Sequence, residues 1–334
     1  MDLAGSPVTV YGASGHTGRF VTAHLLARGL VPVLAGRDPS RLPVAPGLDV
    51  RPAAVDDPAA LDRALAGSAA VINCAGPFAA TAGPVIEAAL RAGIPYVDVA
   101  AEIEANADTF RRYAGRPLPI VPAMAFYGGL GDLLVTTAMG DWADADRVHV
   151  AYGLDSWHPT AGTREAGEVS HRRRGGRRVR YTGGRLEYHD DAPRIERWTF
   201  PPPTGARDVV AEFSMADLVT VPSHLAVPEV RTSMAVEAAR DLAAPDTPAP
   251  VAADASGRSA QSFVVDAVVY RGSEQRRASA TGRDIYAVTA PLAVEAVTRI
   301  LTGRTRTTGA ASAGAMFDAA DFLAALAPDV AVSA

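Results

Sequence analysis

The sequence predicts an α/β protein in which a parallel sheet is joined to a second domain of mixed composition. Between residues 7 and 122, short apolar runs alternate with helical patterns, which is typical of βαβ units. Glycines follow the first apolar run, at the point where a strand would turn into a helix. Beyond residue 140, strand-like stretches follow one another across short turns, which favours antiparallel pairing. These patterns predict a Rossmann-like, doubly wound parallel sheet with an inserted α+β second domain.

The first part of the chain contains six apolar runs of the length of buried strands. They lie at residues 8–11, 31–35, 49–53, 70–75, 96–99 and 120–121. A helix is predicted over 17–28, because apolar residues recur on one face and Gly29 follows as a C-cap. Asp57 and Pro58 predict the start of a further helix, since Asp caps a helix and Pro fits its first position. Another helix is expected near 84–92, before Gly93.

The second part begins with a helix predicted over 132–140. Strands are predicted around 147–152, 179–188, 196–200, 209–213, 261–271 and 275–281. Residues 285–326 have a helical, apolar-periodic pattern. We therefore expect three parts: a Rossmann NADP-binding domain (1–125), an α+β substrate and dimerisation domain (126–284), and a helical segment (285–334) that packs back on the first domain.

The basic residues exclude several kinds of chemistry, because all 32 are arginines and the chain contains no lysine. Without lysine there is no Schiff base to a carbonyl substrate and no phosphate loop of the GK[ST] type. The Tyr-x-x-x-Lys pair of ordinary short-chain reductases is excluded for the same reason.

The bulk properties also bear on partners and location. A formal net charge of −5 gives no general positive field for nucleic acid. No apolar run approaches the roughly 18 to 20 residues of a membrane span. The first residues lack the pattern of a signal peptide, and the single cysteine, Cys74, cannot form an internal disulfide. We therefore predict a cytoplasmic protein that binds neither nucleic acid nor membrane, and we predict no metal site.

The segment from Gly12 to Gly18 predicts a dinucleotide site. Glycine at 12, 15 and 18 allows a tight turn, close approach of a pyrophosphate, and packing of the helix near the strand. The predicted cofactor contacts in this loop are Gly12, Ser14, Gly15, His16, Thr17 and Gly18.

The end of the second strand decides between the two nicotinamide cofactors. Arg37 comes first after Gly36, and an arginine at this place holds the 2′-phosphate of NADP. Arg41 follows one short turn later. The prediction is NADP(H); the alternative is that Asp38 binds the ribose of NAD while Arg37 is merely solvated.

The fourth and fifth strands end where open α/β sheets bind their ligands. We expect residues 73–77 beside the nicotinamide-side ribose, with Asn73, Ala75, Gly76 and Pro77 as cofactor contacts. Cys74 is interpreted as a small buried side chain, since nothing near it in sequence lowers its pKa. Asp98 and Glu102 occupy the equivalent position after the next strand.

Segments at both ends of the chain resemble the saccharopine dehydrogenase-like reductases, a family that includes trans-acting enoyl reductases. The segments are GASGHTGR (12–19), AGRD (35–38), VINCAGPF (71–78), YVDVAAE (96–102), GLGDLL (129–134) and YAVTAPLAVEAVTRIL (286–301). The resemblance implies a Rossmann domain interrupted by a substrate and dimerisation domain, a homodimer, and NADPH-dependent reduction of C=N or C=C bonds. Residues 140–260 match poorly, and family members acting on amino-acid imines often use a lysine, which this chain lacks. The substrate therefore stays open.

Tyr127, in the crossing between the domains, and His158, in the segment 156–163, are the candidate proton donors by residue type and location; water is the alternative source. Asp98 is a further catalytic candidate at its strand end. The predicted function is an NADPH-dependent reductase of a small, free or carrier-bound, substrate with a C=N or C=C bond. The alternative is a non-catalytic NADP-binding sensor or scaffold, and an inter-domain pocket would favour the reductase.

A run of arginines spans residues 172–185, with seven arginines and no acidic residue. One interpretation is a solvated hairpin with Gly175 and Gly176 at its tip. The other is an anion-docking loop, which would steer a substrate tethered to an acidic carrier protein or to coenzyme A.

Overall fold

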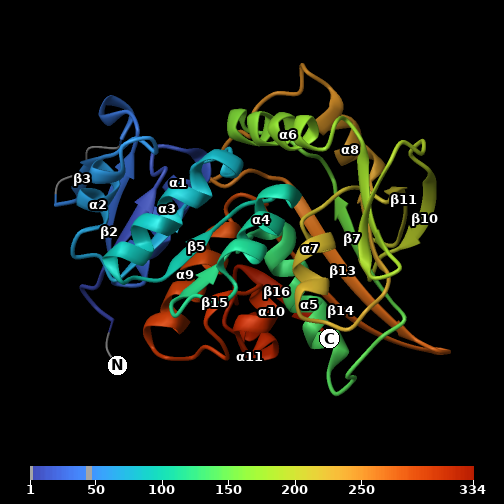
Figure 1. Ribbon diagram of the computed structural model, residues 1–334. Helices are drawn as coiled ribbons and strands as arrows, with labels where there is room; N and C mark the ends of the chain where they lie inside the picture. The colour runs from blue at the N-terminus through green and yellow to red at the C-terminus, as the bar shows by residue number, and fades with distance from the viewer. Residues whose placement is uncertain (1–2, 43–46) are drawn as a thin grey trace.

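The computed structural model describes residues 3–42 and 47–334, whose strands form two sheets (Figure 1). The first sheet has the order β15-β6-β5-β4-β1-β2-β3, and its neighbouring strands pair in parallel. Its strands are β1 (Pro7–Tyr11), β2 (Val31–Gly36), β3 (Asp49–Pro52), β4 (Ala70–Asn73), β5 (Tyr96–Asp98), β6 (Pro119–Val121) and β15 (Gly309–Ala310). This arrangement confirms the Rossmann-like parallel sheet.

Helices cover both faces of this sheet. The covering helices are α1 (His16–Ala27), α2 (Pro58–Leu65), α3 (Phe78–Ala92), α4 (Ile103–Tyr113) and α9 (Thr289–Leu301). One face packs on α1 and α9, which contact each other, and the opposite face packs on α2 and α3. The strand order reverses at β1, with β2 on one side and β4 on the other. The loops after β1 and β4 therefore lie side by side at the carboxyl edge, where such sheets bind ligands.

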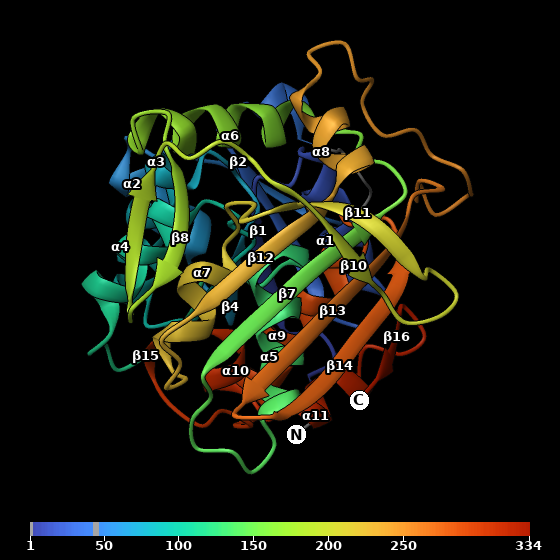
Figure 2. The ribbon, with the colours of Figure 1, turned by 90° about the vertical axis from the view of Figure 1, so that its right-hand side faces the viewer.

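The second sheet is mixed and has the order β10-β11-β12-β7-β13-β14-β16, with β8 and β9 attached beside β12 (Figure 2). Only the pairing of β12 with β7 is parallel in the described part of this sheet. Its strands are β7 (Arg147–Leu154), β8 (Arg178–Thr182), β9 (Arg185–His189), β10 (Ile195–Thr199), β11 (Ala206–Ala211), β12 (Val230–Ala235), β13 (Ser262–Arg271), β14 (Glu274–Arg283) and β16 (Val330–Ser333).

Helix α5 packs against β13 and β14. The remaining helices are α5 (Gly131–Met139), α6 (Ala161–Arg173), α7 (Asp217–Thr220), α8 (Val236–Ala243), α10 (Ala313–Met316) and α11 (Ala319–Ala324), with the short turns η1 (Pro39–Arg41), η2 (Phe126–Leu130) and η3 (Val221–Ser223). The C-terminal segment contributes a strand to each sheet: β15 pairs with β6, and β16 pairs with β14.

The structure corrects two local predictions around the arginine run. The strand expected over 179–188 is a hairpin, because Gly183 and Gly184 have φ of +57° and +77° and form its turn. Gly175 and Gly176 are not at a hairpin tip but join α6 to β8.

The segment 285–334 was predicted to be helical, and its strands β15 and β16 correct that prediction. Helix α6 and strand β12 are among the other elements missing from the sequence prediction. Helix α6 has no apolar stripe, and Ser170 is its one buried residue. It lies across the gap between the two sheets, above α4 (Figure 1). A helix that faces a cavity rather than a core does not carry the 3.6-residue apolar period on which prediction depends.

Candidate active site

The loop between β1 and α1 packs closely against its neighbours, and this requires glycine. Gly12 has φ of +87°, and a Cβ there would lie 2.7 Å from the backbone N of Ala75. A Cβ on Gly18 would overlap the carbonyl oxygen of Gly12. Gly15 is the N-cap of α1, and no side chain caps the helix. The first-turn N–H groups of α1 are therefore open to an anion, which suits a pyrophosphate.

Asn73 fixes the loop after β4 from beneath. Its side chain is fully buried; Nδ2 donates to the hydroxyl of Tyr96 at 3.1 Å, and Oδ1 accepts from the backbone N of Ala75 at 3.0 Å. The predicted cofactor role of Asn73 is thus indirect, through the loop that it holds. Cys74 and Gly76 from this loop line a cavity, and burial raises the pKa of the Cys74 thiol well above its ordinary value. A thiol in this state is a poor nucleophile.

Asp98 lies behind the same loop rather than in the cavity. Its Oδ1 accepts from the backbone N of Ala100 at 3.0 Å and of Ala123 at 2.8 Å, and its Oδ2 accepts from the Tyr96 hydroxyl at 2.8 Å. Burial raises the pKa of this carboxyl to about 6. The hydrogen bonds of Asp98 therefore hold together the ends of β5 and β6. Asp98 does not line the cavity, although it was predicted to be a catalytic residue.

The cavity has a volume of about 610 Å³ and lies between the carboxyl edge of the first sheet and the second domain. Of the residues predicted for the site, those that line it are Ser14, Gly15, His16, Thr17, Gly76 and Tyr127. Gly12, Gly18, Asn73, Ala75 and Pro77 shape the two loops behind it. The structure thus brings the predicted glycine loop and Tyr127 to one space.

Helix α6 forms the wall opposite the first sheet. The residues of α6 that line the cavity are small, namely Ala161, Gly162, Thr163, Ala166, Gly167 and Ser170. A Cβ on Gly76 would lie 3.8 Å from the Cβ of Ala166, so α6 passes directly over the loop after β4. Small side chains on this face leave the space between helix and loop open for a ligand.

Tyr127 carries a polar group without a partner inside the cavity wall. Its ring packs on Phe126, Tyr152 and Trp157, with centroid distances of 4.7, 5.0 and 5.0 Å. The side chain is 6% exposed, and its hydroxyl has no hydrogen-bond partner in the described structure. Burial raises the pKa of the phenol well above its ordinary value of 10. The group therefore stays protonated and is free to donate to a bound molecule.

His158 does not line the cavity, and Tyr286, which the sequence analysis did not select, does. The Tyr286 hydroxyl accepts from Trp157 Nε1 at 3.3 Å and from the backbone N of Thr160 at 3.2 Å. Its ring also contacts the ring of His16 at a centroid distance of 5.2 Å. Tyr286 thus joins the glycine loop to the start of α6. No local sequence pattern marks Tyr286 as a site residue, because all these partners are distant along the chain.

Glu102 is the one carboxylate among the described residues that line the cavity. Its two oxygens accept from the backbone N of Phe78 at 2.7 Å and of Ala79 at 3.1 Å, which caps α3 from the next loop. This cap explains why α3 begins at Phe78 and not near residue 84 as predicted. Burial raises the pKa of Glu102.

A buried carboxyl lies behind Tyr127. The Tyr152 hydroxyl donates to both oxygens of Asp217, at 2.9 and 2.8 Å, and Asp217 is fully buried. Burial raises the pKa of Asp217 from 3.8 to about 7. In the folded protein this group keeps a proton that the unfolded chain releases at lower pH.

The raised pKa predicts a pH dependence of stability. The contribution of Asp217 is complete below its unfolded pKa of 3.8 and is lost as the pH rises through about 7. Between pH 5 and pH 7.5 we expect the free energy of unfolding to fall by about 2 kcal/mol more in the wild type than in Asp217→Asn. Urea unfolding of both proteins at the two pH values measures the difference. Equal pH dependence would contradict the raised pKa.

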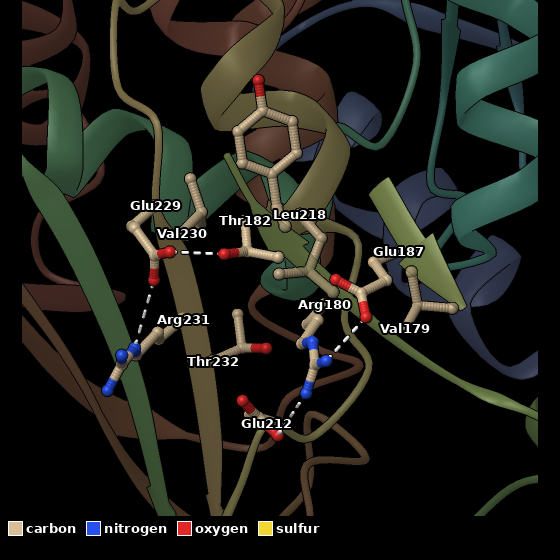
Figure 3. A pocket seen from close by; sticks show the side chains of 11 residues that line it. Val179, Arg180, Thr182, Glu187, Glu212, Leu218, Glu229, Val230, Arg231 and Thr232 are labelled. Atoms are coloured by element: carbon tan, nitrogen blue, oxygen red, sulfur yellow. Dashed lines mark hydrogen bonds and ion pairs between the residues drawn. The ribbon is translucent and has the colours of Figure 1, made fainter. Parts of the chain in front are cut away.

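A second, smaller cavity of about 250 Å³ lies between the β8–β9 hairpin and β12 (Figure 3). Its charged side chains pair with one another: Arg180 with Glu187 at 2.6 Å, and Arg231 with Glu229 at 3.6 Å. Glu229 also accepts from the Thr182 hydroxyl. This cavity receives no residue from the glycine loop, so we place the active site in the larger one.

The fold and the larger cavity define a dinucleotide-binding α/β protein, and the comparisons agree. Residues 12–114 match the family described as NAD(P)H-binding. The "probable mitochondrial saccharopine dehydrogenase-like oxidoreductase" of Arabidopsis thaliana is 30% identical over 116 residues, which cover 29% of this chain and 26% of that protein. The chain thus matches about a quarter of the length of this curated relative.

The solved structure of saccharopine dehydrogenase (L-Glu forming) from Saccharomyces cerevisiae matches the whole chain. The TM-score is 0.66 at 12% identity, over 99% of this chain and all of that one. The chain thus has the fold of the yeast saccharopine dehydrogenase structure, and its residues 12–114 match an NAD(P)H-binding family. The resemblance noted in the sequence is confirmed at this level.

Two further observations concern the described residues. None of their helices has the length and apolar character that crossing a bilayer requires. No three of their histidine, cysteine or acidic side chains are grouped so that they could hold a metal ion.

Proposed function

We propose that the protein is an NADPH-dependent reductase that acts on a C=N or C=C bond of a small molecule, free or carrier-bound. The observation that supports this is the shared cavity. The glycine loop borders it on one side, α6 of the second domain on the other, and the unpartnered Tyr127 phenol lies between them. A non-catalytic sensor needs the glycine loop but has no use for an enclosed proton donor beside it.

The bound cofactor would supply a hydride. The chain positions the cofactor and the substrate and supplies a proton. The α1 N-terminus holds the pyrophosphate, and Gly76 lets the backbone after β4 approach the reacting end closely. Phe126 and Trp157 exclude water from the wall around Tyr127. Because its pKa is high, Tyr127 gives its proton only to a strongly basic centre, such as the carbon or nitrogen that receives electrons during reduction.

The proposal is tested by following NADPH oxidation with two substrate panels, cyclic imines and α,β-unsaturated thioesters. We expect turnover with members of one panel, which also decides between C=N and C=C reduction. Tight NADPH binding without oxidation in either panel would support the sensor instead.

We propose NADPH rather than NADH as the cofactor, from the loop after β2. Asp38 is engaged as a cap, since its Oδ1 accepts from the backbone N of Ser40 at 3.0 Å and from its hydroxyl at 2.7 Å. Arg41, one turn later, lines the cavity. Arg37 does not line it, but is exposed beside the same edge. Two guanidiniums, beside an aspartate that already accepts hydrogen bonds from Ser40, suit a 2′-phosphate better than a ribose diol.

Arg37→Ala and Arg41→Ala are each expected to weaken NADPH binding by about 1.5 to 3 kcal/mol, the range for a hydrogen bond to a charged group. NADH binding should change little, because it lacks the phosphate. Fluorescence titration of both cofactors against wild type and variants measures this. A wild-type preference for NADH, or equal losses for both cofactors, would show that Asp38 rather than arginine selects the cofactor.

We further propose a cytoplasmic homodimer, with the second domain in the interface, as the resemblance implies. Sedimentation of the purified chain tests the oligomeric state.

A further inference from the structure

The arginine run of residues 172–185 is divided by the fold into inward and outward side chains. Arg172 pairs with Glu168 on the surface of α6, and Arg173 pairs with Asp108 of α4. Arg177 lies over the ring of Tyr188. These three do not line the cavity, so they cannot bind a group inside it.

Arg174 and Arg178 do line the cavity, at the C-terminal end of α6. The Arg174 side chain is 17% exposed; its Nη1 donates to the Ser170 hydroxyl at 2.9 Å and lies 3.8 Å from Glu104. Its Nε is buried without a hydrogen-bond partner in the described structure. A buried guanidinium N–H without an acceptor costs free energy, so this position favours a ligand that can accept from it.

Arg178 adds a positive charge that forms no ion pair with a carboxylate among the described residues, although Glu212 and Asp191 lie near it. Its Nη2 donates to the carbonyl oxygens of Ala211 at 2.5 Å and Glu212 at 2.9 Å, and its Nη1 donates to that of Asp191 at 3.1 Å. These carbonyls orient the guanidinium but do not neutralise it. Burial correspondingly lowers the pKa of Arg178.

We infer that Arg174 and Arg178 form an anion subsite at this end of the cavity, for a substrate with an apolar body and one carboxylate or phosphate group. The inference rests on the proposed function, because it assumes that the reacting bond lies near the loop after β4. The lining of the same cavity includes the apolar side chains of Val210, Phe213 and Met215. An uncharged substrate without an acceptor would leave the buried Nε of Arg174 without a hydrogen bond, and a polar body would gain nothing from these apolar side chains.

The spacing limits the size of the substrate. Ala166 faces Gly76, and Ser170, which contacts the Arg174 guanidinium, lies four residues further along α6. Four residues of helix rise by about 6 Å. The anionic group therefore lies roughly one helical turn from the loop after β4, which corresponds to a short chain of about four to six carbon atoms.

The subsite is tested on the NADP+-saturated protein by calorimetric titration with hexanoate, hexyl phosphate and hexan-1-ol. We expect at least one of the two anions to bind tenfold or more tightly than the alcohol, and the preferred anion identifies the charged group. R174Q should lower the affinity for that anion at least tenfold and leave hexan-1-ol unchanged. R174K keeps the positive charge and should retain part of the affinity, which separates loss of the subsite from loss of the fold.

The matched control is R172Q, since Arg172 is two residues away but exposed and turned outward. It should bind all three probes as the wild type does. Unchanged anion affinity in R174Q, or an alcohol that binds wild type as tightly as the anions, overturns the subsite. NADP+ affinity is measured in the same samples. If the wild type binds NADP+ but neither anion, the subsite alone is contradicted. If the wild type does not bind NADP+, the proposed function is contradicted.

Discussion

Tyr127→Phe is expected to lower kcat by about 10²- to 10⁴-fold, the usual contribution of a general acid. The variant removes only the hydroxyl, which has no hydrogen-bond partner in the described structure, so packing against Phe126, Tyr152 and Trp157 is kept. The affinity for NADPH should be unchanged, because the phenol does not belong to the glycine loop. Steady-state kinetics with whichever of the two substrate panels is turned over, and a separate NADPH titration, measure the two quantities.

Tyr270→Phe is a suitable control for this variant. Tyr270 lies at the far end of β13, where its ring faces the guanidinium of Arg147 at 4.3 Å, and it does not line the cavity. The kcat of Tyr270→Phe should equal that of the wild type. If Tyr127→Phe also kept full turnover, the proton would come from water or from another group, and the role of Tyr127 would be limited to shaping the wall.

Gly15→Val is expected to weaken NADPH binding by more than about 100-fold while the domain stays folded. Gly15 has φ of −71°, which any residue adopts, and a Cβ there would lie 3.2 Å from the carbonyl oxygen of Gly12. The protein can accommodate that contact with a small shift. The two methyl groups, however, would extend over the first turn of α1, where the pyrophosphate must approach the backbone.

Gly115→Val provides the matched control, because a Cβ at Gly115 would meet nothing within 4 Å and its φ is not positive. Both variants should unfold at nearly the wild-type temperature, and only Gly15→Val should lose NADPH in calorimetry. Normal affinity in Gly15→Val would mean that the phosphates bind elsewhere than at the N-terminus of α1.

The first six strands of the first sheet were predictable because their information is local, whereas β15 lies in a segment predicted to be helical. Each buried strand is a short apolar run, and Asp57 caps α2 as expected, with its carboxylate accepting from the backbone N of Ala60 at 2.9 Å. The start of α3 was not predictable, since its cap is Glu102, which lies after the next strand. Helix α6 escaped prediction because its inward face is fitted to a cavity and not to an apolar core.

The candidate site likewise has features that depend on local sequence and features that depend on residues distant along the chain. By itself, the sequence determined the parallel α/β class and the position of the glycine loop, because a tight turn between strand and helix restricts which residues can stand there. It could not separate Arg174 from Arg172, since neighbouring arginines carry the same local signal. Nor could it choose between Tyr127 and His158, since either residue type can donate a proton. Only the tertiary structure decided which of them face the cavity, because that depends on how α6 and the crossing after β6 pack against loops more than fifty residues away.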